Sequence, residues 1–136
     1  MRALLRVGFA LAILAMMGRT DAQPSLTQRD GQGAVTVAVT LAASPQVGVS
    51  IRATVALDTH TIALDGIAFE RAVVLRTPGE VEVAPTAVEG ATGGGHHRQA
   101  VVSFPPVTQP GTVRIVVKSV GGIAERSFAW ELAPKP

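Results

Sequence analysis

Two long segments alternate large apolar residues with small or polar ones, and this alternation restricts the fold more than any other feature of the sequence. The first runs from Val35 to Leu41 and the second from Val49 to Leu57, and both are rich in β-branched residues. A period of two places every second side chain on the same face of an extended strand. We therefore expect two half-buried β-strands here.

Shorter segments of the same kind follow, and each is bounded by Gly or Pro. Strand patterns occur at 72–76, 80–83, 99–104, 113–118 and 125–132. Seven or eight short strands without a long helical pattern predict an all-β protein, specifically an antiparallel immunoglobulin-like β-sandwich. A small closed barrel is the alternative that the number of strands leaves open.

The parity of the strands also predicts which side chains form the core. Residues of the apolar parity point between the two sheets, where each large side chain contributes about 1.5 to 3 kcal/mol on burial. The predicted core consists of Val35, Val37, Val39, Ile51, Val55, Val113, Ile115, Val117, Phe128 and Trp130.

The segment from Thr61 to Arg71 has no single interpretation. Thr61–Leu64 fits a strand, and Asp65-Gly66 is typical of a two-residue hairpin turn. Ile67–Arg71 fits equally well a single helical turn across the end of the sandwich. Both alternatives stay open.

The N-terminus has the three-part organisation of a secretory signal peptide. Arg2 and Arg6 precede the apolar run Val7–Met17, and a polar stretch then ends at the small residue Ala22. The run is shorter than the roughly 20 residues that span a bilayer, so we expect cleavage after Ala22 rather than anchoring. The predicted organisation is a signal peptide at 1–22, a flexible leader at 23–33 and a β-sandwich domain at 34–133. We expect an exported protein, periplasmic or secreted, with no membrane span after cleavage.

Composition limits the partners and the stabilising chemistry. Three of the 12 basic and one of the 10 acidic residues lie in the predicted signal peptide, so nine of each remain and the formal net charge after cleavage is zero. Since no basic stripe is left for a phosphate backbone, we expect no nucleic-acid binding. The chain has no Cys, which excludes disulfides and lipid attachment through a thiol.

All three histidines lie at predicted strand boundaries, beside glycines or a carboxylate. His60 follows Asp58 by two residues, which places both on one face of an extended segment, and His96 and His97 follow Gly93–Gly95. Gly reaches positive φ without strain, so a bend there can turn adjacent imidazoles toward one point. Imidazole with carboxylate suits Zn²⁺ or Cu²⁺. We therefore expect a metal site formed by Asp58, His60, His96 and His97, with the choice between the two metals left open.

Other interpretations stand beside the metal site. The two segments that carry the histidines, Asp58–Thr61 and Gly93–Arg98, also have the composition of hydrogen-bonded turns. We expect no enzymatic activity, because the chain has no Gly-x-Ser-x-Gly motif, no Cys nucleophile and no phosphate-binding loop. The alternative function is a non-catalytic interaction module that docks on a protein of the cell envelope, since neutral Val-rich strands leave surface that can pair with another chain. Arg98, Glu125 and Arg126 are interpreted as members of surface ion pairs.

The polar motifs resemble those of a group of small exported bacterial domains. The shared segments are Asp58-Thr59-His60-Thr61, Gly94-Gly95-His96-His97-Arg98 and Glu125–Trp130, within a resemblance that covers about Val49 to Leu132. It implies export and a β-sandwich. A looser resemblance to small periplasmic copper-carrying β-sandwich proteins implies a copper-carrying role. Those proteins typically use an N-terminal His or Met ligands, whereas all three Met residues of this chain lie in the predicted signal peptide.

Overall fold

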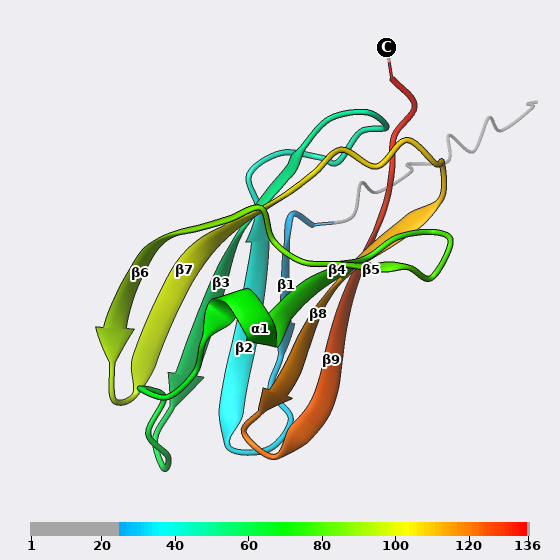
Figure 1. Cartoon of the computed structure of the whole chain (residues 1–136). Helices are drawn as coiled ribbons and strands as arrows, with labels where there is room; N and C mark the ends of the chain where they lie inside the picture. Colours follow the sequence, from blue (N-terminus) through cyan, green and yellow to red (C-terminus); the bar gives the residue numbers. More distant parts are fainter. Residues whose placement is uncertain (1–24, 136) are drawn as a thin grey trace, which may run out of the picture.

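Residues 25–135 are described by a computed structural model, in which two antiparallel β-sheets face each other (Figure 1). The five-stranded sheet has the order β1-β2-β3-β7-β6, and the four-stranded sheet has the order β5-β4-β8-β9. The strands of the first sheet are β1 (Thr27–Asp30), β2 (Val35–Leu41), β3 (Ile51–Thr59), β6 (Ala87–Gly94) and β7 (His97–Phe104). The strands of the second are β4 (Val73–Arg76), β5 (Glu82–Val83), β8 (Thr112–Val120) and β9 (Ile123–Glu131).

The all-β prediction is confirmed. The described strands form two separate antiparallel sheets around one core, as in a sandwich, and they do not close into a barrel. Their number, nine, exceeds the seven or eight expected, because β1 and β6 are edge strands without an alternating pattern. The immunoglobulin-like type stays a prediction.

The core lies between the sheets, and both sheets contribute to it. All ten predicted core residues are buried, with at most 4% of their surface exposed. Leu57, Leu75, Val102 and Phe104 are among the further members of the same cluster. The prediction succeeded because parity in a strand is a geometric property, independent of which strands are neighbours.

Strand β1 corrects the predicted leader at 23–33. Thr27–Asp30 pairs with β2, so the ordered part of the chain begins before residue 34. The hydroxyl groups of Thr27 and Thr40 lie 2.9 Å apart, and the side-chain amide of Gln28 donates to the carbonyl of Ala129 at 2.7 Å. β1 thereby connects the edge of the first sheet with β9 of the second. The predicted signal peptide at 1–22 lies outside the described residues.

Arg126 corrects the expectation of a surface ion pair. Only 1% of this residue is exposed, and it lies between the β1–β2 turn and the β8–β9 hairpin. Its guanidinium donates to the carbonyls of Gln32 at 2.6 Å and Val35 at 3.0 Å, and also to that of Val120 at 2.8 Å. Asp30 Oδ1 lies 3.6 Å from its Nε. Burial lowers the pKa of Arg126, and the nearby Asp30 carboxylate opposes this effect.

The segment that the sequence left open contains one helical turn, α1 (Phe69–Ala72), and Thr61–Leu64 forms no strand. The helical alternative is therefore correct. Phe69 is 2% exposed, and α1 contacts β4 and β8 of one sheet and β6 of the other, in front of the strands in Figure 1. Within residues 25–135, no helix has the length and apolar character needed to cross a membrane.

Candidate functional site

The two histidine-bearing segments lie side by side at one end of the five-stranded sheet. β3 and β7 are antiparallel neighbours, and Asp58 is directly opposite His97 in their register. The backbone N–H of Thr59 donates to the carbonyl of His96 at 2.9 Å, which extends the pairing into the turn. The β6–β7 turn and the chain leaving β3 form this end, at the lower left of Figure 1. The end of β3 and the start of β7 are therefore adjacent, as a shared metal site requires.

Asp58 and His97 form a side-chain hydrogen bond, with 2.5 Å between Asp58 Oδ1 and His97 Nδ1. An ionised carboxylate can only accept a hydrogen bond, so Nδ1 carries the proton and Nε2 of the neutral ring keeps its lone pair. The side chains are 48% exposed for Asp58 and 55% exposed for His97. The pair therefore holds an oriented imidazole that solvent can reach.

His60 and His96 do not join this pair. Both are exposed, in the turns that follow β3 and precede β7. In the part of the chain that the structure describes, no three His, Asp or Glu side chains are grouped closely enough to hold a metal ion. Of the four predicted ligands, the structure thus brings Asp58 and His97 together and leaves the other two outside. Side chains at a turn have no neighbouring strand to orient them.

The glycine run shapes the hairpin that carries His96 and His97. Gly93 has a φ of 84°, and a Cβ atom at this position would overlap the carbonyl oxygen of His97. Gly95 has a φ of 61° and forms, with His96, the two-residue turn between β6 and β7. Positive φ at the first central residue is typical of type II′ hairpins. The predicted bend exists, but it closes a hairpin rather than directing both imidazoles to one point.

Asp65, which we did not predict as a site residue, holds the loop after β3 against this hairpin. Both of its carboxylate oxygens lie 3.2 Å from the backbone nitrogen of Gly95, whose N–H they accept. A Cβ atom on Gly94 would approach Asp65 Oδ1 to 2.9 Å, so a larger residue at this position would displace the Asp65 carboxylate. The sequence Asp65-Gly66 is typical of a turn, but the Asp65 side chain contacts the backbone of Gly95, 30 residues further along the chain.

Arg98 also holds the loop after β3 in place, and it is not the surface ion-pair residue that the sequence suggested. Its guanidinium donates to the carbonyls of Leu64 at 2.9 Å and Ile67 at 2.6 Å. It also lies over the ring of Phe69, 5.1 Å from the centroid, where cation and π-system attract each other. Its function in the structure is to position the loop and α1 beside the histidine-bearing hairpin.

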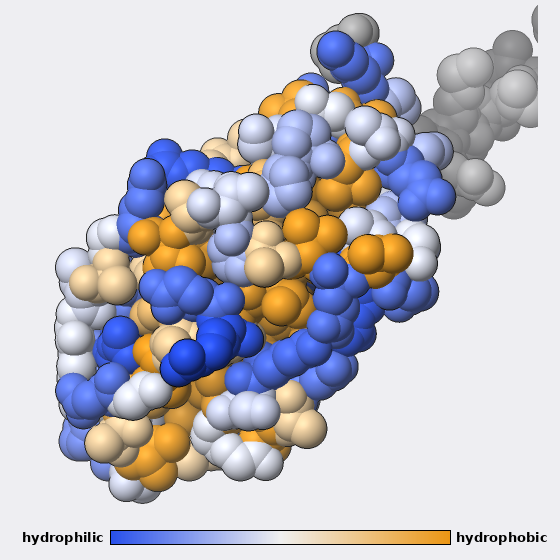
Figure 2. All heavy atoms as spheres, in the orientation of Figure 1, coloured by the Kyte–Doolittle hydropathy of each residue, from blue (hydrophilic) through white to orange (hydrophobic). Residues whose placement is uncertain are grey.

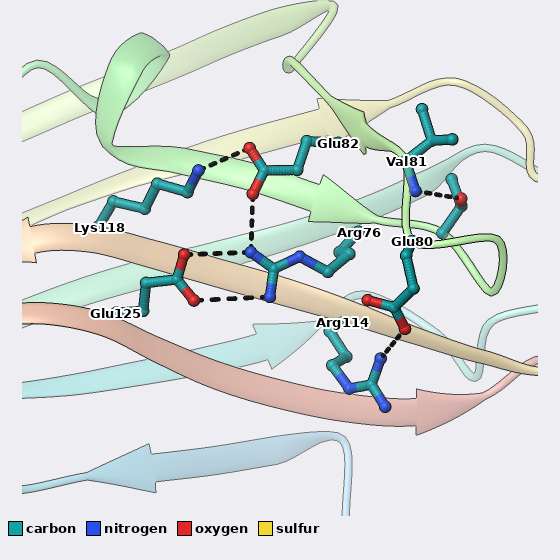
Figure 3. Close-up of polar contacts among 8 residues, drawn as sticks. Arg76, Glu80, Val81, Glu82, Arg114, Lys118 and Glu125 are labelled. Carbon is teal, nitrogen blue, oxygen red and sulfur yellow. Dashed lines mark hydrogen bonds and ion pairs between the residues drawn. The ribbon is translucent and has the colours of Figure 1, made fainter.

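A second group of charged residues lies on the outer face of the four-stranded sheet (Figure 3). Arg76 binds Glu82 at 2.7 Å and Glu125 at 3.1 Å, and Lys118 lies 2.6 Å from the second oxygen of Glu82. Hydrogen bonds from Lys118 and Arg76 hold the pKa of Glu82 below its ordinary value of 4.5, and those to Glu82 and Glu125 raise the pKa of Arg76. Glu125 is thus a surface ion-pair residue, as expected. Because these charges are paired with one another, the group is not a candidate binding site.

Comparisons with protein-family models, with curated proteins and with solved structures find no match to this chain.

Proposed function

We propose that this chain is an exported, non-enzymatic β-sandwich protein that binds a divalent transition-metal ion, Zn²⁺ or Cu²⁺, at the end of β3 and β7. The observation that carries the proposal is the hydrogen bond between Asp58 and His97. Metal-binding histidines typically donate their second ring N–H to a carboxylate, which fixes the tautomer and makes the free nitrogen a stronger ligand. His97 has this arrangement, with Nδ1 bonded to Asp58 and Nε2 free.

Asp58 is an orienting group in this proposal, not a ligand as the sequence suggested. His97 Nε2 is the first ligand, and rotation of the exposed side chains of His60 and His96 supplies the others. The hydrogen bond from Thr59 to His96 keeps the two turns adjacent, which supports this assignment. Water fills the remaining positions and leaves the ion exchangeable, unlike in a closed structural site.

A binding role agrees with the surroundings of the pair. A carboxylate–imidazole pair catalyses acyl transfer only beside a nucleophile. Over residues 25–135, His97 has no side-chain hydrogen-bond partner other than Asp58. Export rests on the signal-peptide pattern at 1–22.

The immunoglobulin-like type is part of the same proposal. The orders β2-β3-β7-β6 and β5-β4-β8-β9 correspond to strands ABED on one sheet and C′CFG on the other in immunoglobulin domains, with β1 as an added edge strand. This chain departs from antibody domains in having no Cys and in carrying its single Trp, Trp130, on the last strand.

Calorimetric titration of Zn²⁺ and Cu²⁺ into the mature chain, residues 23–136, tests the metal site. We expect binding that is abolished in His97→Ala and weakened about 10- to 100-fold in Asp58→Ala, because an orienting carboxylate typically has that effect on affinity. His60→Ala and His96→Ala are expected to have smaller effects. Since ligand imidazoles must be neutral, binding should be weaker at about pH 5 than at about pH 7.5. Equal binding by wild type and His97→Ala, or no binding by wild type, contradicts the proposal.

An interaction module is the second candidate, and the outer edge of β6 favours it. β6 is the last strand of its sheet, and no described strand pairs with its outer edge. Residues Glu89–Gly94 are all exposed. A register irregularity between Glu89 and Thr92 protects the middle of the edge, so Thr92–Gly94 is the part able to pair with another chain.

Sedimentation velocity over a range of concentrations tests this candidate with a second copy as the partner. Wild type should sediment faster as concentration rises, and Thr92→Lys should not, because a charge on an edge opposes strand pairing. A wild-type chain that stays monomeric at every concentration removes self-pairing at β6.

A further inference from the structure

A surface pocket of about 390 Å³ lies between α1 and the end of β8, apart from the histidine-bearing hairpin. Its apolar part is formed by Ile67, Ala68, Ala72 and Val120. Figure 2 shows hydrophobic residues reaching the surface between strongly hydrophilic ones on the face where α1 lies in Figure 1. The pocket therefore combines an apolar floor with a polar rim, the usual make-up of a small-molecule site.

The charged residues that line this pocket have one sign. Two of its lining residues, Arg71 and Lys118, are basic and none is acidic. The ammonium group of Lys118 is occupied by Glu82 at 2.6 Å, as Figure 3 shows. Arg71 is exposed, and among the described residues no carboxylate lies within ion-pair distance of its guanidinium. One guanidinium is thus free to meet an anion at the rim.

Ser119, also in the lining, has an unusual backbone conformation. Its φ is 55°, in the left-handed region that costs a non-glycine residue about 1 to 2 kcal/mol. The tight turn formed by Gly121 and Gly122 begins two residues later and has positive φ at both residues. Residues held in such conformations are found disproportionately at binding sites. Ser119 adds an exposed hydroxyl donor to the lining that Arg71 also belongs to.

We propose that this pocket binds a small organic carboxylate with a short aliphatic body. The carboxylate pairs with the Arg71 guanidinium and accepts a hydrogen bond from Ser119. The aliphatic part covers the half-buried Ile67, Ala68 and Ala72. Arginine suits this role because its planar donors match the two oxygens of a carboxylate.

Calorimetry and backbone NMR with octanoate as the probe, in the presence of a metal chelator, test the proposal. Octanoate should shift the resonances of Ala68, Ala72 and Val120. Acetate, which lacks the tail, and octylammonium, which has the same tail and the opposite charge, should bind at least about tenfold more weakly. Equal binding of octanoate and octylammonium would show simple hydrophobic adsorption and overturn the proposal.

Arg71→Glu should weaken octanoate binding at least about tenfold, since a like charge replaces an attractive one. Arg29→Glu, which makes the same change at an exposed position on β1, should leave it unaltered. Equal loss in both variants would point to a general charge effect and contradict the site. His97→Ala should retain full octanoate binding, so this test is independent of the metal proposal.

Discussion

Asp58 and His97 face each other across β3 and β7, and their side chains meet at 2.5 Å. Directly opposite residues on neighbouring antiparallel strands have Cβ atoms about 4.5 to 5.5 Å apart, so the pairing itself brings the two side chains into contact. The hydrogen bond therefore follows from the register of β3 and β7.

The first prediction concerns the tautomer of His97. In wild type at a pH where the ring is neutral, the nitrogen chemical shifts of His97 should report a proton on Nδ1. Asp58→Ala removes the acceptor and should give a mixture of both tautomers. The shifts of His60 serve as the internal control and should not change. Identical His97 shifts in the two proteins would contradict the structural assignment.

The core could be predicted from the sequence, and the site only in part, for a physical reason that Arg126 illustrates. It shares its parity with Phe128 and Trp130, so the pattern does place it inside. A charge overrides that indication unless its partners are known, and two of its three backbone carbonyl partners, those of Gln32 and Val35, lie 94 and 91 residues away in the chain. Such partners leave no mark on a single sequence.

The histidine site shows the same limit. The sequence identified Asp58 and His97 as candidates because both lie at strand ends. Their contact, however, depends on the register of β3 and β7, which brings together two residues 39 positions apart in the chain. Asp65 and Arg98 were missed for a similar reason, because each binds backbone groups of a distant loop. Strand β6 was missed because an exposed, Gly-containing edge strand has no apolar parity.

The second prediction tests the close approach of Gly93 to His97. Gly93→Ala introduces a Cβ that overlaps the His97 carbonyl oxygen, in addition to a backbone with positive φ. Gly48→Ala is the matched control, since Gly48 has a φ of 77° and no atom within 4 Å of the added Cβ. In urea unfolding, Gly48→Ala should lose about 1 kcal/mol and Gly93→Ala about 2 kcal/mol or more. Equal losses would show that the approach is looser than described.

The third prediction concerns acid and the ion pairs of Figure 3. The folded-state pKa of Glu82 lies below its ordinary value of 4.5, mainly through the hydrogen bond from Lys118. The unfolded chain therefore binds the proton more tightly, so the contribution of Glu82 to stability is complete above its ordinary pKa and is lost as pH falls through the lower folded-state pKa. The difference in unfolding free energy between wild type and Glu82→Gln should shrink between about pH 7 and about pH 3. Glu70→Gln, on the exposed side of α1, should differ little from wild type throughout.

The fourth prediction concerns export. The signal-peptide pattern ends at Ala22, so mass spectrometry of the exported chain should give an N-terminus at or near Gln23, in open or cyclised form. Ser25 lies three residues after Ala22, so the hydrogen bond of 3.0 Å from Trp130 Nε1 to the Ser25 carbonyl would be retained after cleavage. An intact Met1 on a membrane-bound chain would contradict both cleavage and release.

The last prediction measures what the buried guanidinium of Arg126 contributes. It donates to three carbonyls, of which Gln32 and Val35 belong to the β1–β2 segment and Val120 to the end of β8. Arg126→Met keeps much of the side-chain volume but leaves the buried carbonyls of Val35 and Val120 with fewer donors, and Asp30 loses its neighbouring cation. We expect a loss of about 3 kcal/mol in urea unfolding, because each unsatisfied buried polar group costs about 1 to 3 kcal/mol. Arg29→Met on the exposed side of β1 should change stability by no more than about 0.5 kcal/mol.

Because β1 depends on this attachment, its amide protons should also exchange faster in Arg126→Met than those of β3. A variant as stable as wild type, with β1 equally protected, would show that apolar packing alone holds β1 in place.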